Sequence, residues 1–321
     1  MKEGTHKLMT LDFWRICISN FLLYAAVWML LPILPAESYL SGFERTDITL
    51  SMLLFVITMI GVGPLHAYLG DAHKRKHVLL QSTLALALCA VGSLLITQVW
   101  HLWILMAFAG AMFGIATTAG ITVAIDITQS HRRGAGNRMY AFSGALGLLT
   151  GLCLLSRLYL VMDYQPLVYI SLALLTACLI TQSGVYVAFR APVGVGWLNI
   201  DRFFLPNAWL PAVNVCVLTM GIGMTTSLLP PYTWLSTLTL VALTIGVVPL
   251  TRMFVKLSHH CQRGTANTTL QLSMMLGLLM GMMIGECVEN SLIISIVVLS
   301  LSLLALLLIT WPYFKRNRVR K

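Results

Sequence analysis

The sequence predicts an all-α protein that crosses a membrane about ten times, and three observations support this prediction. Hydrophobic residues make up 58% of the 321 positions and charged residues only 10%, far below the roughly one quarter that is typical of soluble domains. Apolar runs of about 20 residues recur along the whole chain, long enough to cross a bilayer as helices. Nearly all basic residues fall between alternate pairs of these runs.

Ten apolar runs are the predicted membrane helices. They cover residues 13–34, 48–69, 78–97, 101–125, 140–161, 166–189, 208–229, 232–253, 268–287 and 291–313. The first run is too long for the apolar part of a cleavable signal peptide and lacks a small-residue cleavage pattern, so we expect it to be retained as a membrane helix.

The basic residues predict the orientation of the chain. With the N-terminus in the cytoplasm, 19 of the 21 Lys and Arg residues fall on the cytoplasmic side. Only Arg45 lies in an outer loop, and Arg157 lies in the outer part of the fifth run. The positive-inside rule therefore accounts for the net charge of +10 without a nucleic-acid partner. We expect a multi-pass protein of the cytoplasmic (inner) membrane, with both termini in the cytoplasm and the lipid bilayer as its partner.

One stretch of the sequence occurs twice. Residues 132–151 read RRGAGNRMYAFSGALGLLTG and residues 262–281 read QRGTANTTLQLSMMLGLLMG, with nine identities at a constant offset of 130. Both copies follow an even-numbered run, so an even number of helices separates them and they share one orientation. The repeat favours two parallel halves over two inverted halves.

Enzymatic, metal and cofactor roles find no support in the sequence. The chain has no HExxH, Gly-x-Ser-x-Gly or phosphate-binding-loop pattern and no paired carboxylates inside a run. Its seven cysteines are scattered and include no CxxC, which is typical of packing residues in membrane helices. His259, His260 and Cys261 are consecutive and cannot all face one ion from a helix. We therefore expect no enzyme, no metal and no cofactor.

Several segments resemble the major facilitator superfamily. The first run, NFLLYAAVWMLLPILP at 20–35, is similar to that family's first helix, and DRFFLPNAWLP at 201–211 resembles the entry to its seventh helix. The loop AYLGDAHKRK at 67–76 resembles the family's signature loop, Gly-x-Leu-Ala-Asp-Arg-x-Gly-Arg-Arg/Lys. In register with that pattern are Leu69, Asp71, Arg75 and Lys76, while Ala67, Ala72 and Lys74 depart from it.

The resemblance implies two parallel helical bundles, a six-helix bundle at 1–190 and a four-helix bundle at 207–321, joined by a cytoplasmic linker at 191–206. The family plan has six helices in each half. From Leu11 to Arg133 the chain has 122 residues and four runs, whereas from Asn207 to Arg263 it has 56 residues and two runs. The difference leaves room for two more membrane helices, so the chain is predicted to lack the equivalents of helices eight and nine.

The signature loop carries an expected gating role. The resemblance implies that Asp71 lies near the start of the ninth predicted span, where a carboxylate stabilises a helix N-terminus by about 0.3–1 kcal/mol. Arg75 would bridge Asp71 to Asp126 at the cytoplasmic end of the fourth span. Leu69 and Lys76 belong to the same loop. The alternative interpretation is an ordinary basic cytoplasmic loop, which explains the basic residues but not Asp71.

The two Arg-Gly loops suggest both anchoring and packing roles. Arg133 and Arg263 are expected to contact lipid headgroups on the cytoplasmic side. Small residues at four-residue spacing follow each loop and allow close approach of helices; the resemblance implies that they pack across the two halves. These residues are Ser143, Gly147, Gly151, Ser273, Gly277 and Gly281.

Candidate substrate contacts lie near the middle of the membrane. Asn20, Tyr24 and Trp28 repeat at four-residue spacing and form one stripe on the first span. Asn214 on the seventh span is a candidate opposite them, since an Asn in hydrocarbon requires a partner. Hydrogen bonding between helices, with the aromatic residues at the membrane interface, explains the same residues equally well.

The resemblance implies a secondary transporter that moves a small organic solute, such as a drug or metabolite, out of the cell by alternating access. A proton or other ion is a possible coupling partner, but no Asp or Glu lies near the middle of any span, and Met106 stands where the family has an Arg. The alternative is a non-transporting or truncated protein of the same fold with a binding or scaffold role. The sequence does not predict the substrate or the oligomeric state.

Overall fold

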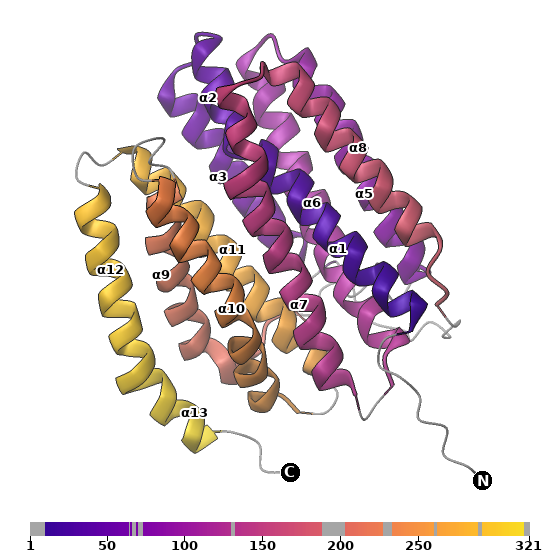
Figure 1. Ribbon diagram of the computed structural model, residues 1–321, viewed down its shortest axis with the longest axis vertical. Coiled ribbons are helices and arrows are strands. Elements are labelled where there is room, and N and C mark those ends of the chain that lie inside the picture. Colours follow the sequence, from indigo (N-terminus) through magenta and orange to yellow (C-terminus); the bar gives the residue numbers. More distant parts are fainter. Residues whose placement is uncertain are drawn as a thin grey trace.

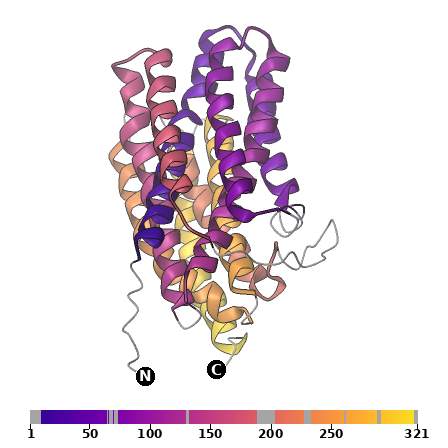
Figure 2. The ribbon, with the colours of Figure 1, turned by 90° about the vertical axis from the view of Figure 1, so that its right-hand side faces the viewer.

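The computed structural model describes residues 10–63, 65, 69, 73–129, 132–187, 203–226, 233–259, 262–287 and 291–317. Within these residues all regular structure is helical. Figure 1 and Figure 2 show long helices side by side, with α1 beginning and α13 ending toward the same end of the molecule. We call this end the terminal end and the other the opposite end.

The helices form two groups along the chain (Figure 1). The first group is α1 (Leu11–Leu30), α2 (Ile33–Leu40), α3 (Arg45–Gly61), α5 (Arg75–Gly92), α6 (Val99–Ile127), α7 (Arg133–Leu149) and α8 (Tyr164–Ser183). The second group is α9 (Trp209–Thr226), α10 (Thr233–Leu257), α11 (Arg263–Cys287), α12 (Ser291–Ala305) and α13 (Trp311–Asn317). Of the predicted linker at 191–206, residues 191–202 lie outside the described residues.

Nine helical segments of the described residues are long and apolar enough to cross a membrane. The predicted span at 48–69 corresponds to α3, whose 17 residues fall just below the length that a straight span needs. The first span is longer than predicted, because α2 continues α1 to Leu40 after a break at residues 31–32. Pro32 has no backbone N–H to continue the helix, which explains the break. The predicted polytopic all-α fold is confirmed.

Packing mainly follows the two groups, with one large exception. In the first group α1 packs against α7 and α8, and α6 packs against α3 and α5. In the second group α9 packs against α11 and α12. The exception is α10, whose most extensive contact is with α7 of the first group rather than with α9 or α11.

The small residues of α7, and of the π-helical segment Thr150–Leu155 that continues it, pack against α1, inside the first group. A Cβ on Gly147 would overlap the carbonyl oxygen of Phe21, and a Cβ on Gly151 would lie 2.7 Å from that of Ala25. Ser143 lies on the same face, where its hydroxyl accepts a hydrogen bond from Asn20 Nδ2 at 3.2 Å. These residues therefore allow the backbones of α1 and α7 to touch.

The small residues of α11 pack against α9 in the same way. A Cβ on Gly277 would overlap the carbonyl oxygen of Cys216, and one on Gly281 would overlap that of Met220. The third member, Ser273, is buried and donates its hydroxyl to Thr269 O of its own helix at 2.7 Å. The expectation that these faces pack across the two halves is wrong. Four-residue spacing defines one face of a helix but not the neighbour that it meets.

The two glycine contacts are copies of one another. Gly147 and Gly277 are 130 residues apart, and the residues they touch, Phe21 and Cys216, are 195 residues apart. Gly151 and Gly281 are likewise 130 residues apart, and the residues they touch, Ala25 and Met220, are 195 residues apart. The α1–α7 pair is thus repeated as the α9–α11 pair. The repeat therefore includes α1 and α9, although these two helices show no obvious sequence similarity.

Candidate functional site

A small cavity lies between the two groups of helices. Its walls come from α1, α7, α10 and α11. The lining residues are Tyr24, Tyr140, Ala141, Gly144, Ala145, Leu148, Val247, Asn267, Leu270, Gln271, Met274 and Met275. The centre of a water molecule can move within about 30 Å³ of this cavity, which is room for one or two waters in the present conformation.

The cavity is built from equivalent positions of the repeat. Four positions on α7, at 140, 141, 144 and 145, line it, and so do the four positions on α11 that follow them by 130 residues. A cavity lined by the same face of two repeated helices lies between the repeats, close to the axis that relates them. This is the place where parallel repeats of a transporter form a binding site.

The predicted stripe on α1 is fully buried, and its three residues differ in role. Asn20 Nδ2 donates to the carbonyl oxygen of Tyr140 at 2.9 Å and so joins α1 to α7. Tyr24 lines the cavity, with its ring 5.4 Å from that of Phe113 in an edge-to-face arrangement. Trp28 is completely buried beside Gly151 and does not line the cavity. Of the stripe, only Tyr24 lines this cavity.

Asn214 does not lie opposite this stripe. With its amide group oriented for hydrogen bonding, Nδ2 donates to Ser302 O at 3.3 Å and Oδ1 accepts from Leu306 N at 3.2 Å. An α-helix would join those two backbone groups directly, and here α12 changes to a π-helical turn at Leu306–Thr310. The Asn214 side chain thus inserts into the backbone hydrogen bonds of a neighbouring helix. The expected position facing the first span is corrected.

Arg75 and Asp126 form the ion pair that was expected near the signature loop. Arg75 Nη1 donates to Asp126 Oδ2 at 2.6 Å and joins α5 to α6. The Asp126 side chain is 6% exposed, so the pair is shielded from solvent. Asp71 lies outside the described residues, whereas Leu69 is half-buried and packs against the core.

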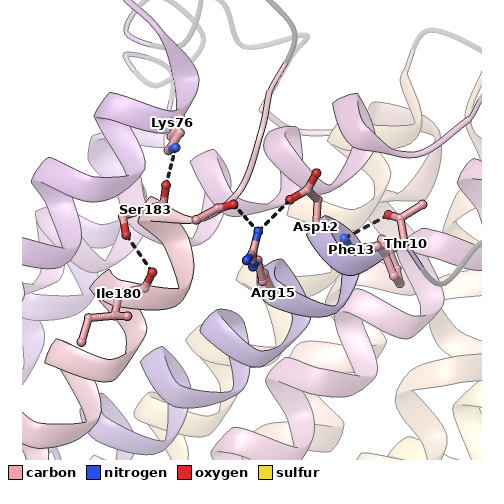
Figure 3. A network of polar contacts seen from close by, with 8 residues as sticks. Thr10, Asp12, Phe13, Arg15, Lys76, Ile180 and Ser183 are labelled. Carbon is pink, nitrogen blue, oxygen red and sulfur yellow. Dashed lines mark hydrogen bonds and ion pairs between the residues drawn. The ribbon is translucent and has the colours of Figure 1, made fainter.

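Basic side chains cover the terminal end of α8 (Figure 3). Lys76 Nζ donates to Ser183 O at 2.6 Å, and Arg15 Nη1 donates to Gly184 O at 2.6 Å. Both carbonyls lie at the C-terminus of α8, where cations satisfy free carbonyl groups and favour the helix dipole. Lys76 therefore contacts its own group of helices, as the ordinary-loop interpretation implies.

The two Arg-Gly loops begin α7 and α11. Arg133 is the first residue of α7 and is half-buried, and its Nε atom is buried with no hydrogen-bond partner among the described residues. Arg263 is the first residue of α11, but its side chain is not described. Of the His259, His260 and Cys261 run, only His259 is described, and it is exposed. The described residues contain no cluster that could hold a metal ion.

Two polar residues of the cavity were not predicted. Asn267 is buried and Gln271 is half-buried, one turn apart on α11, and both line the cavity. The repeat itself contained a signal, because Gln271 occupies the position at which α7 has the small residue Ala141. A polar side chain that replaces a small apolar one between two otherwise similar helices points to a site with a separate role.

The α7–α10 contact crosses from one group to the other. Thr244 Oγ1 lies 3.4 Å from Ala145 O, and Arg157 Nη2 donates to Thr237 Oγ1 at 3.0 Å. Arg157, which we expected near the outer surface, lies in the short helix Ser156–Leu160 beyond α7 and extends this contact between the groups. At the terminal end the groups also meet where α11 contacts α3 and α6, with Gly264 beside Ile125.

Comparison with known protein families decides the identity of the fold. The family model described as Major Facilitator Superfamily matches residues 16–319. The chain belongs to this superfamily. Its members are membrane transporters rather than enzymes, and the resemblance drawn from the signature loop and the repeat is confirmed. A comparison of this chain with curated proteins finds no match.

Solved structures of superfamily transporters share the fold of this chain. A bacterial homologue of the iron transporter ferroportin, in an outward-facing state, has a TM-score of 0.64 at 11% identity, covering 96% of this chain and 99% of that one. The nucleoside transporter NupG has a TM-score of 0.57 at 12% identity, covering 97% and 100%. The human organic anion transporter MFSD10 (TETRAN) has a TM-score of 0.56 at 12% identity, covering 92% and 97%.

Proposed function

We propose that this protein is a secondary transporter that exports a small organic solute across the cytoplasmic membrane by alternating access. The observation that carries the proposal is the cavity on equivalent repeat positions of α7 and α11. The positive-inside rule supports a cytoplasmic location for the terminal end, where the basic residues gather. The two moving parts would derive from the halves 1–190 and 207–321.

The contacts between the groups support a revised division of the moving parts. Because α10 packs chiefly on α7, we infer that α10 moves with the first group, while α9, α11 and α12 form the second moving part. The contact of Gly264 with Ile125 joins the two groups at the terminal end in the present conformation. Transport would require this contact to open, as rigid-body gating of one group against the other implies. The ferroportin homologue of similar fold is outward-facing, which agrees with closure at the cytoplasmic side.

A scaffold or binding role is the second candidate, and the α7–α10 contact favours it. A helix held by both groups resists their relative motion, and two fewer membrane helices leave more of α10 uncovered. Leu238 and Ile245 on α10 are 59% and 66% exposed, respectively. In this second case the cavity would stay closed and no solute would cross.

Paired distance measurements distinguish the two candidates. We would attach spin labels at His77 and Asn317 at the terminal end, and in a second variant at Thr97 and Ile293 at the opposite end; all four positions are exposed. Alternating access predicts two distance populations in each variant, with one distance longer where the other is shorter. A single population in both variants, unchanged by candidate solutes, would contradict transport and favour the scaffold role.

A further inference from the structure

The polar groups of the cavity carry no charge. Among the described lining residues the polar side chains are two tyrosines and two amides, Tyr24, Tyr140, Asn267 and Gln271, and the remainder are apolar or small. Transfer of an ion into such a site without a counter-charge is strongly unfavourable. The arrangement selects against charged ligands on energetic grounds alone.

One buried hydroxyl lacks a partner. Tyr24 is 1% exposed, and its Oη atom makes no hydrogen bond among the described residues. A buried hydroxyl without a partner costs about 1–3 kcal/mol, so such a group in a native protein favours the binding of a molecule that can hydrogen-bond to it. Because Tyr24 lines the cavity, we expect a ligand bound there to supply the partner that this hydroxyl lacks.

The opposite wall supplies complementary amides and apolar surface. Asn267 and Gln271 each offer two donors and one acceptor oxygen, and both line the cavity from α11, whereas Tyr24 lines it from α1. Met274 and Met275 follow on the same wall. Methionine side chains are flexible and polarizable and adapt to irregular apolar shapes.

We propose that the cavity binds an uncharged organic molecule that has both a hydrogen-bond donor and an acceptor, such as an amide or an alcohol, attached to an apolar body. Tyr24 and Gln271 bind the polar group from α1 and α11, and Met274 and Met275 contact the apolar body. This inference rests on the proposed transport function, because it names the class of solute for the same site.

A screen balanced by charge tests the ligand class. The purified full-length protein is heated with equal numbers of neutral, cationic and anionic small molecules built on shared skeletons, for example phenylacetamide, phenethylammonium and phenylacetate. Binding stabilises the folded state and raises the unfolding temperature in a saturable manner. We expect the saturable hits to be concentrated among the neutral compounds.

Three variants make the screen specific to the cavity. Gln271→Leu keeps the size of the side chain and removes its hydrogen bonds, so we expect roughly tenfold weaker binding of the neutral hits. Gln262→Leu is the matched control at the beginning of α11, outside the cavity, and should change nothing. Gln271→Glu introduces a negative charge and should shift the preference toward the cationic member of each set.

The outcomes separate the two proposals. Hits concentrated among charged compounds, or neutral hits that Gln271→Leu leaves unchanged, would overturn the ligand class while transport through the protein remains supported by the distance measurements. A lack of saturable hits, together with a single distance population at each end, would overturn the proposed function itself.

Discussion

The hydroxyl of Thr244 on α10 lies 3.4 Å from the carbonyl oxygen of Ala145 on α7. The residue 130 positions before Thr244 is Gly114 of α6, and it lies against the backbone of Met59 on α3. The ends of the helices keep the same offset, because α6 ends at Ile127 and α10 at Leu257. Thus α7 packs on α10 where, in the first half, α3 packs on α6. On α10, α7 of the first half therefore takes the place that α3 takes on α6, a place for which the second half has no equivalent helix of its own.

This arrangement predicts that cross-links have different effects at two contacts. The side chain of Cys153, in the π-helical segment Thr150–Leu155 that follows α7, contacts Thr237 on α10, so Thr237→Cys places two thiols together within one proposed moving part. We expect the resulting disulfide to leave the two distance populations and solute transport nearly unchanged.

The comparison cross-link joins the parts that must separate. Ile125→Cys with Gly264→Cys connects α6 to α11 at the terminal end, and we expect its disulfide to abolish transport and leave one distance population. Reduction of the disulfide should restore both. The division of moving parts would be wrong if the α7–α10 cross-link blocked transport as completely as the α6–α11 cross-link. Both variants require the other native cysteines to be replaced.

Close glycine contacts predict a large effect from one added methyl group. Gly147→Ala would place a methyl group against the carbonyl oxygen of Phe21 and force α1 and α7 apart. We expect a loss of about 1–3 kcal/mol of stability, the usual cost of overpacking, measured by unfolding of the purified protein in detergent. Gly246→Ala is the control, because a Cβ there meets nothing within 4 Å, and it should be neutral or stabilising by up to about 1 kcal/mol. Equal losses in both variants would contradict the packing argument.

The shielded ion pair predicts a stability difference between two aspartates. Asp126→Asn leaves Arg75 facing a neutral group at the 2.6 Å contact, and we expect a loss of about 1–3 kcal/mol. Asp12→Asn removes a longer pair with Arg15, 3.4 Å apart, in which both side chains are about one third exposed, and should cost less than about 1 kcal/mol. If the two variants unfold at the same temperature, the Arg75–Asp126 pair does not stabilise the fold as argued.

Asn214 predicts a separation of helix shape from ligand binding. Asn214→Ala removes the amide that contacts Ser302 and Leu306, so we expect the stability or the shape of α12 to change. The neutral hits should bind with unchanged affinity. Asn267→Ala removes a cavity residue and should weaken those hits several-fold. Binding that depends on Asn214 and not on Asn267 would return the site to the position that the sequence alone suggested.

Helices and their repetition could be predicted from the sequence, because composition and periodicity act locally. The boundaries were less exact: the spans were predicted to begin at 140 and 268, whereas α7 and α11 begin at Arg133 and Arg263, so the Arg-Gly pairs belong to the first helical turn rather than to a loop. Contacts between helices could not be predicted in the same way. The faces that carry Gly147 and Gly277 were recognised correctly. The spacing along one helix, however, does not reveal whether the neighbouring helix belongs to the same half of the protein or to the other half.

The cavity shows the same limit from the other side. Tyr24 was predicted because aromatic and polar residues inside a membrane are conspicuous, whereas Gln271 lies at a place where only comparison of the two repeats draws attention to it. Asn214 was equally conspicuous, yet its partners are backbone atoms of α12. Backbone groups released by a π-helical turn leave no mark in the sequence.

The two walls of the cavity differ in side-chain size at equivalent positions. Three of the four facing positions on α7 carry Ala141, Gly144 and Ala145, where α11 carries Gln271, Met274 and Met275; at the fourth, Tyr140 corresponds to Leu270. In the proposed transporter, the small side chains on α7 would leave room for the solute, while the longer side chains on α11, together with Tyr24, would select its chemical groups. Substitutions at Ala141 or Ala145 would then change the size limit while leaving Gln271 in place.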